Sequence, residues 1–145
     1  PRIINAGRKV NDGMSNYIAK RIFFNMKNKK IKVRNSKILI LGCTFKKNCT
    51  DTRNSKIFDL VNKLKISGIN VDIHDPWIKN KKDENLKKLK IISKIKKKYD
   101  VIVLGVAHNI FKKFKNYQIK KFLKKTNVVY DLCNFFDDEI VTERL

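Results

Sequence analysis

The sequence predicts an α/β fold in which a Rossmann-like, doubly wound parallel sheet carries helices on both faces. Two short apolar segments, 38–41 and 101–104, are continuous rather than alternating, which is typical of strands buried on both sides, and a further strand is predicted at 128–132. Segments with helical periodicity separate them, and a repeated strand–helix order favours a parallel sheet. A long helix is predicted ahead of this sheet.

The predicted N-terminal helix covers residues 1–29. Its apolar residues recur every four positions and form a stripe, which consists of Val10, Met14, Ile18, Ile22 and Met26. The stripe either packs on the domain's own sheet or covers a partner, and the sequence leaves both alternatives open.

A strand–loop–helix unit follows a polar connector at 30–37. The strand at 38–41 ends at Gly42, and Asn54-Ser55 predicts the N-cap of a helix over 54–67 that begins near Lys56. Gly68 is expected to end this helix. The loop between them lies at the carboxyl edge of the sheet, where open α/β folds bind ligands. Lys46, Lys47 and Arg53 are candidate phosphate contacts there.

The remaining elements are shorter. We expect a strand at 69–74 closed by an Asp75-Pro76 turn, a short helix near 83–90, and a weak strand or helix at 90–95. After the strand at 101–104, the spacing of apolar residues predicts two short helices within 111–123. The final strand is predicted at 128–132, with residues 137–145 as a tail.

The net charge of +22 makes a basic module for nucleic acid or another anionic partner the alternative function. Against this alternative, only 6 of the 35 cationic residues are Arg, the side chain best suited to bidentate phosphate and base contacts. Lys, Ile and Asn are abundant in core and surface segments alike, as a skewed genome composition would produce. We therefore expect no nucleic-acid partner.

The other chemistry-bearing residues do not form a recognisable site. Cys43, Cys49 and Cys133 are an odd number without metal-ligand spacing, which favours reduced thiols in the cytoplasm. His74 and His108 end predicted strands, where loop packing is a commoner role than metal ligation. No apolar run approaches the roughly 20 residues that span a bilayer, so no membrane partner is expected.

The stretch Leu-Gly-Cys-Thr-Phe-Lys-Lys-Asn-Cys-Thr-Asp-Thr-Arg-Asn-Ser at 41–55 resembles the start of the C-terminal, UDP-binding domain of the UDP-glucose/GDP-mannose dehydrogenase family. Its residue pattern, Asn-Cys-x-Asp-x-Arg-Asn-Ser at 48–55, is most similar to that of UDP-N-acetylglucosamine and UDP-N-acetylgalactosamine 6-dehydrogenases. Residues 6–12 and 71–76 resemble the same family, so the resemblance covers nearly the whole chain.

The resemblance implies that residues 1–30 belong to a central dimerisation helix and that 36–145 form a UDP-sugar-binding domain. The parent enzyme would be a homodimer that oxidises C6 of a UDP-sugar to the carboxylate with NAD, for surface-polysaccharide synthesis in the cytoplasm. The first strand is followed by Gly42 alone and not by G-x-G-x-x-G, so this loop is not built for NAD. In the family, the NAD domain and the catalytic cysteine lie upstream. We therefore expect no catalytic residue here and no activity from this chain alone.

The resemblance also implies residue roles. Phe45 and Lys46 match a pair that contacts the nucleotide, Arg8 and Asn11 match a segment near the substrate, and Arg53 matches an arginine that reaches the cofactor. From its chemistry alone, Phe45 could be a core aromatic, and Arg53 could pair with Asp51 or Asp75. One departure is Cys133, which stands where many family members carry Arg or Lys that helps hold the nucleotide.

Overall fold

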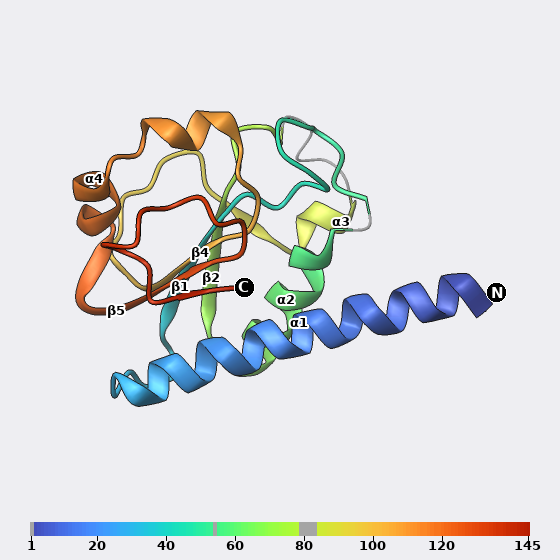
Figure 1. The fold of residues 1–145 in the computed structure, drawn as a ribbon, viewed down its shortest axis with the longest axis horizontal. Coiled ribbons are helices and arrows are strands. Elements are labelled where there is room, and N and C mark those ends of the chain that lie inside the picture. The colour runs from blue at the N-terminus through green and yellow to red at the C-terminus, as the bar shows by residue number, and fades with distance from the viewer. Residues whose placement is uncertain (1, 54, 79–83) are drawn as a thin grey trace.

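A six-stranded, all-parallel sheet with the strand order β3-β2-β1-β4-β5-β6 forms the centre of the domain (Figure 1). The computed structural model describes the backbone of residues 2–53, 55–78 and 84–145, and the side chains of 13–53, 55–78, 84 and 86–145. The strands are β1 (Lys37–Leu41), β2 (Asn70–His74), β3 (Lys90–Ile91), β4 (Tyr99–Leu104), β5 (Leu123–Asp131) and β6 (Glu143–Arg144). The helices are α1 (Arg2–Asn28), α2 (Lys56–Ile66), α3 (Glu84–Lys87), the 3₁₀ helix η1 (Asn109–Lys113) and α4 (Asn116–Lys121). The predicted doubly wound fold is confirmed.

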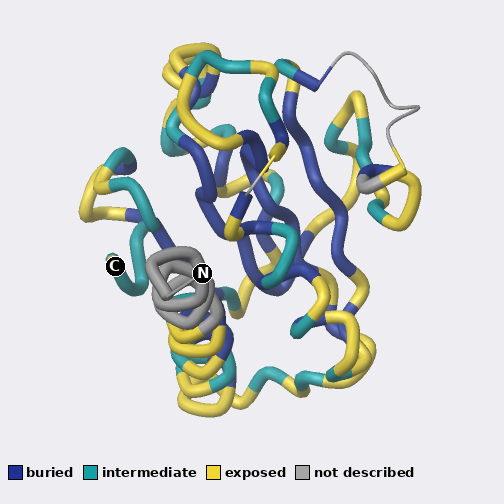
Figure 2. Tube along the Cα trace, turned by 90° about the vertical axis from the view of Figure 1, so that its right-hand side faces the viewer, coloured by how far each residue is buried: buried dark blue, intermediate teal, exposed yellow. Residues whose placement is uncertain are grey.

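The central strands are buried on both faces, which explains their continuous apolar sequences. Figure 2 shows them as a dark blue layer inside the domain. Successive residues of a strand point to opposite faces, so Ile38 and Ile40 face the core shared with α1 and α2, whereas Leu39 and Leu41 face the core shared with η1 and α4. One sheet therefore supports two hydrophobic cores.

The second half of α1 packs on its own domain. Ile18, Ile22 and Met26 are fully buried in the core that also contains α2 and one face of β5. Of the two alternatives for the apolar stripe, docking on the domain's own sheet is confirmed for this half. Val10 lies outside the described side chains.

Local signals set the ends of α2, as predicted. The Ser55 hydroxyl accepts a hydrogen bond from the Ile57 N–H and caps the first turn. At the other end, Gly68 adopts a φ of +83°. Its N–H donates to the Lys65 carbonyl and the Ile69 N–H donates to the Leu64 carbonyl, which together make a Schellman motif.

The C-terminal segment differs from the prediction. The strand expected at 128–132 begins earlier, at Leu123, and it is not the last strand. The Thr142 N–H donates to the Val129 carbonyl and the Leu145 N–H to the Asp131 carbonyl, so the predicted tail adds β6 to the sheet edge. A two-residue strand is too short to have a detectable pattern, and long-range pairing alone defines it.

Over the residues that the structure describes, no helix combines the length and the apolar character needed to cross a bilayer.

Candidate functional site

A hollow of about 580 Å³ opens at the carboxyl ends of β1 and β4. In this strand order, the connections leaving β1 and β4 run to opposite faces of the sheet, and ligands of open α/β folds bind in that crevice. We call it the β1–β4 hollow. It is lined by Thr44, Phe45, Lys46, Lys47, Ser55, Lys56, Ile57, Gly105, Val106, Ala107 and Cys133.

Two glycines allow the loops around this hollow to approach closely. Gly42 has a φ of +86°, and a Cβ there would lie 2.6 Å from the Val106 carbonyl oxygen. A Cβ on Gly105 would lie 2.5 Å from the Gly42 carbonyl oxygen and 2.8 Å from Cδ1 of Ile57. Since real Cβ atoms do not approach backbone so closely, both positions require glycine. The strand-ending glycines visible in the sequence thus bring the β1 and β4 loops together.

The rim of the β1–β4 hollow is cationic and carries one exposed ring. Lys46, Lys47 and Lys56 line it, and the N-terminus of α2 adds a partial positive charge. Phe45 is 57% exposed, so its alternative role as a core aromatic is wrong. The arrangement suits an anion, such as a phosphate group, attached to a flat or apolar body that packs on the ring.

A buried polar network fixes the loop that carries these residues. His108 Nδ1 lies 2.8 Å from the Asn48 N–H, which donates to it, so the proton of the neutral ring is on Nε2. Nε2 lies 3.0 Å from Asp75 Oδ2 and 3.2 Å from Thr44 Oγ1. The same Asp75 oxygen accepts from the Cys43 N–H at 2.8 Å. The 43–48 loop is therefore held by groups from the ends of β2 and β4.

The sequence predicted a loop-packing role for His108, and the structure confirms it. It did not predict that His108 would order the loop containing Phe45 and Lys46. The available signal was a histidine after one strand and an aspartate after another, because the carboxyl ends of parallel strands meet at one sheet edge.

Arg53 pairs with Asp51, one of the two partners that its chemistry suggested. Its guanidinium Nη2 lies 3.0 Å from Asp51 Oδ2, and the hydrogen bond from Arg53 lowers the pKa of that carboxyl group. The Arg53 side chain is 82% exposed and does not line the β1–β4 hollow. Its contact with a cofactor stays a prediction. The side chains of Arg8 and Asn11 lie outside the described residues.

The cysteines differ in their surroundings. Burial, reinforced by the charge of Asp75, raises the pKa of the Cys43 thiol far above its usual value. Burial also raises the pKa of Cys133, whose side chain lines the β1–β4 hollow. The departure from the family pattern therefore falls on the wall of this hollow. Among the side chains that the structure describes, no three His, Cys, Asp or Glu residues gather as a metal site.

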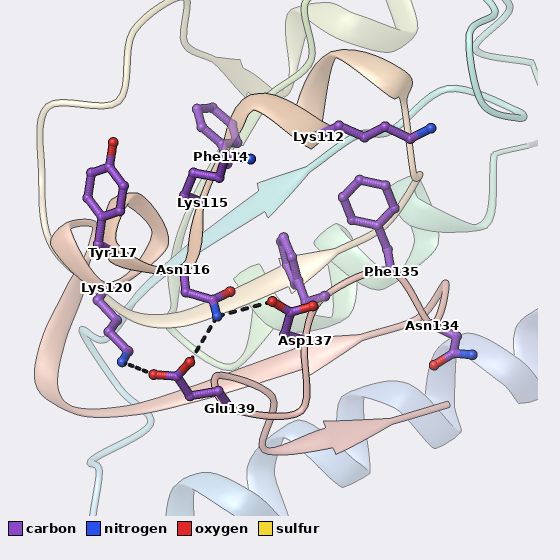
Figure 3. A pocket seen from close by; sticks show the side chains of 11 residues that line it. Lys112, Phe114, Lys115, Asn116, Tyr117, Lys120, Asn134, Phe135, Asp137 and Glu139 are labelled. Carbon is purple, nitrogen blue, oxygen red and sulfur yellow. Dashed lines mark hydrogen bonds and ion pairs between the residues drawn. The ribbon is translucent and has the colours of Figure 1, made fainter.

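A second hollow, of about 860 Å³, lies between α4 and the segment after β5 (Figure 3). Figure 3 shows that four of its polar groups point toward one another: Asn116 donates to Asp137 and Glu139, and Lys120 donates to Glu139. Because these groups hydrogen-bond to one another, they leave fewer free donors and acceptors for a ligand. The smaller β1–β4 hollow, at the crevice between the two connections, is the better candidate site.

Comparisons with known proteins find relatives over most of this chain. Residues 39–138 match the sequence model of the UDP binding domain of the UDP-glucose/GDP-mannose dehydrogenase family. A UDP-N-acetyl-D-glucosamine 6-dehydrogenase of Salmonella typhi is 41% identical over 133 residues, which are 91% of this chain and 31% of that protein. One of Pseudomonas aeruginosa is 36% identical and covers 96% of this chain and 33% of its own length. The chain thus spans about a third of the curated relatives that it matches.

Solved structures show the same fold. The UDP-D-ManNAc dehydrogenase from Pyrococcus horikoshii matches 97% of this chain and 32% of its own, with a TM-score of 0.73 and 25% identity. An NDP-N-acetyl-D-galactosaminuronic acid dehydrogenase from Methanosarcina mazei Go1 has a TM-score of 0.79 at 24% identity, over 92% of this chain and 28% of its own. These relatives are dehydrogenases, and they give the nucleic-acid alternative no support.

Proposed function

Because the chain belongs to the UDP-glucose/GDP-mannose dehydrogenase family, with its UDP binding domain at residues 39–138, we propose that the β1–β4 hollow binds the UDP part of a UDP-sugar. The parent enzyme would be an NAD-dependent 6-dehydrogenase. A UDP-N-acetylhexosamine is the proposed substrate, because the relatives in Salmonella typhi and Pseudomonas aeruginosa are UDP-N-acetyl-D-glucosamine 6-dehydrogenases.

The observation that carries this proposal is the placement of Phe45 and Lys46. Both line the β1–β4 hollow beside the N-terminus of α2, and both are exposed toward solvent rather than packed in the core. The ammonium group of Lys46 and the positive end of α2 would meet the diphosphate, and the ring of Phe45 would pack against the nucleoside. His108 holds their loop in place before the ligand arrives, which reduces the ordering cost of binding.

The division of the parent protein is also proposed. Residues 1–30 would contribute a dimerisation helix, with Arg8 and Asn11 near the substrate, and 36–145 would form the UDP-sugar-binding domain. A second domain would hold most of the NAD, with Arg53 reaching toward it. The cofactor would supply hydride acceptance from C6 of the sugar, while the residues of this chain would bind and orient the nucleotide. A place in surface-polysaccharide synthesis in the cytoplasm stays a prediction.

Calorimetric titration of this chain with UDP tests the proposal. We expect saturable binding that weakens in Phe45→Ala and Lys46→Ala, with Lys30→Ala as the matched control because Lys30 lines a different hollow. Duplex DNA at two salt concentrations tests the alternative. Counterion release would make DNA affinity fall steeply with salt, whereas UDP affinity should change moderately. Salt-steep DNA binding without UDP binding would refute the proposal.

An assay for NADH tests the proposed division. The pure chain, mixed with NAD⁺ and UDP-N-acetylglucosamine, should produce none, because the cofactor fingerprint is missing after β1. Measurable turnover would show that the chain holds more of the active site than we propose.

A further inference from the structure

The carboxylate of Asp131, at the end of β5, orders the turn that follows the strand. Oδ1 accepts from the Cys133 N–H at 2.9 Å, and Oδ2 accepts from the N–H groups of Phe135 at 2.7 Å and Phe136 at 2.8 Å. Asp131 itself is fully buried. Because Cys133 lines the β1–β4 hollow, this carboxylate sets the position of one wall of that hollow.

Arg144 of β6 provides the opposite charge. Its Nη1 donates to Asp131 Oδ2 at 2.8 Å, and its Nη2 donates to the Phe136 carbonyl at 2.6 Å and to Asp138 Oδ1 at 2.7 Å. Removing a buried carboxylate's only ionic partner leaves an uncompensated charge, and within the described residues Arg144 is the cation that pairs with Asp131. The planar guanidinium also fixes the direction of the contacts, which an ammonium group could not do.

The neighbouring residue, Glu143, connects β6 to the long helix. Its carboxylate accepts from Nε of Arg21 at 2.9 Å and from Nδ2 of Asn25 at 3.1 Å, and both donors lie on α1. Two adjacent residues of one short strand thus contact α1 on one side and the turn after β5 on the other. A shift of α1 relative to β6 would reach Cys133 through the Arg21–Glu143 pair, then the backbone of β6, and then the Arg144–Asp131 pair.

We infer that Arg144 is a positioning residue that holds the Cys133 wall of the β1–β4 hollow in place, and that Glu143 makes the position of this wall depend on α1. The inference rests on the proposed function, since it concerns the wall of a UDP site. Neither residue lines the hollow, so each acts through Asp131 and the 132–136 turn.

Calorimetry with UDP and thermal unfolding of the same variants test this inference. Arg144→Lys keeps a cation but loses the guanidinium fork, and Glu143→Gln weakens the contact with α1. We expect UDP affinity to fall about 2- to 30-fold in Arg144→Lys, and to fall less in Glu143→Gln. Glu139→Gln is the matched control, because it breaks an exposed pair with Lys120 in the same segment without contacting Asp131.

Thiol alkylation provides a readout that a merely structural role would not change. Cys43 is buried, so in a Cys49→Ser background the slow modification of Cys133 reports on the hollow wall. Arg144→Lys should change the rate at Cys133 and reduce its protection by UDP. If Arg144→Lys does not fold, Asp138→Asn replaces it, since Asp138 is an exposed partner of Arg144.

A lower melting temperature with unchanged UDP affinity and unchanged Cys133 alkylation would overturn the inference. If the wild-type chain does not bind UDP, the proposed function fails. The alkylation rate still tests whether Arg144 positions Cys133, so the two failures are distinguishable.

Discussion

Replacing His108 by Phe removes both ring nitrogens from the buried network beneath the 43–48 loop and keeps an aromatic ring of similar shape. The variant keeps the ring contacts of His108 with Trp77 and Phe111, whose ring centroids lie 5.9 Å and 5.5 Å from that of His108. What the variant loses is the hydrogen bond to Asp75 Oδ2, the one from the Asn48 N–H, and the 3.2 Å contact of Nε2 with Thr44 Oγ1. The change therefore separates hydrogen bonding from packing.

The loss of folding stability is set mainly by the first two of these contacts, because Asp75 and Thr44 share the single Nε2 proton. A hydrogen bond to a charged group contributes about 1.5–3 kcal/mol and a neutral one about 0.5–1.5 kcal/mol, so the loss is about 2–4.5 kcal/mol. For a domain of this size each kcal/mol lowers the melting temperature by about 2–4 °C. The expected drop of about 4–18 °C leaves the chain folded at room temperature, because domains are stable by about 5–15 kcal/mol.

UDP affinity should fall as well, because the loop must be ordered when the ligand binds. Fixing the backbone of even one residue costs about 1–2 kcal/mol, which corresponds to a dissociation constant for UDP that is roughly 5- to 30-fold larger. Calorimetry and differential scanning calorimetry of the same samples measure both effects.

His74→Phe is the matched control for this variant. His74 also lies near Phe111, at 6.3 Å, but its ring nitrogen contacts the Ile92 carbonyl and not the loop. We expect a loss of about 0.5–1.5 kcal/mol and unchanged UDP affinity. If His108→Phe lowers the melting temperature and leaves UDP affinity equal to that of the control, the loop does not hold the nucleotide and our reasoning is wrong.

Three further changes have defined outcomes. Lys46→Ala should weaken UDP binding about 10- to 150-fold, the equivalent of a charge-assisted contact of about 1.5–3 kcal/mol; equal affinity in calorimetry would contradict it. Arg53→Ala should leave UDP affinity of this chain unchanged, because Arg53 pairs with Asp51 outside the hollow, and should lower turnover of the full-length enzyme. Gly105→Ala should lower the free energy of unfolding by about 1–3 kcal/mol in denaturant unfolding, since its Cβ would meet backbone. Gly13→Ala should instead stabilise helix α1 by about 0.5–1 kcal/mol, because a Cβ there has nothing within 4 Å. Equal stability of these two variants would refute the close-approach argument.

The sequence alone determined the elements whose signals are local. The apolar run before Gly42, the cap at Ser55 and the stop at Gly68 each depend on residues within one turn of the chain, so the β1–α2 unit was predicted correctly. The order of strands and helices then required a parallel sheet, and the sheet placed the 43–55 loop at its ligand-binding edge. Phe45 and Lys46 were predicted to contact the nucleotide because the sequence of that loop resembles the dehydrogenase family.

Only the tertiary structure decided how the loop is held and where the chain's last strand lies. His108 contacts residues that are 33 and 60 positions away along the chain. Arg144 reaches Asp131 only because β6 pairs with β5 over two residues. Such contacts cannot be predicted from sequence periodicity, because each depends on which strand ends meet at one edge of the sheet. Periodicity and capping report the energetics of neighbouring residues, whereas the buried charges and polar groups of this domain are satisfied by partners that folding alone brings within hydrogen-bonding distance.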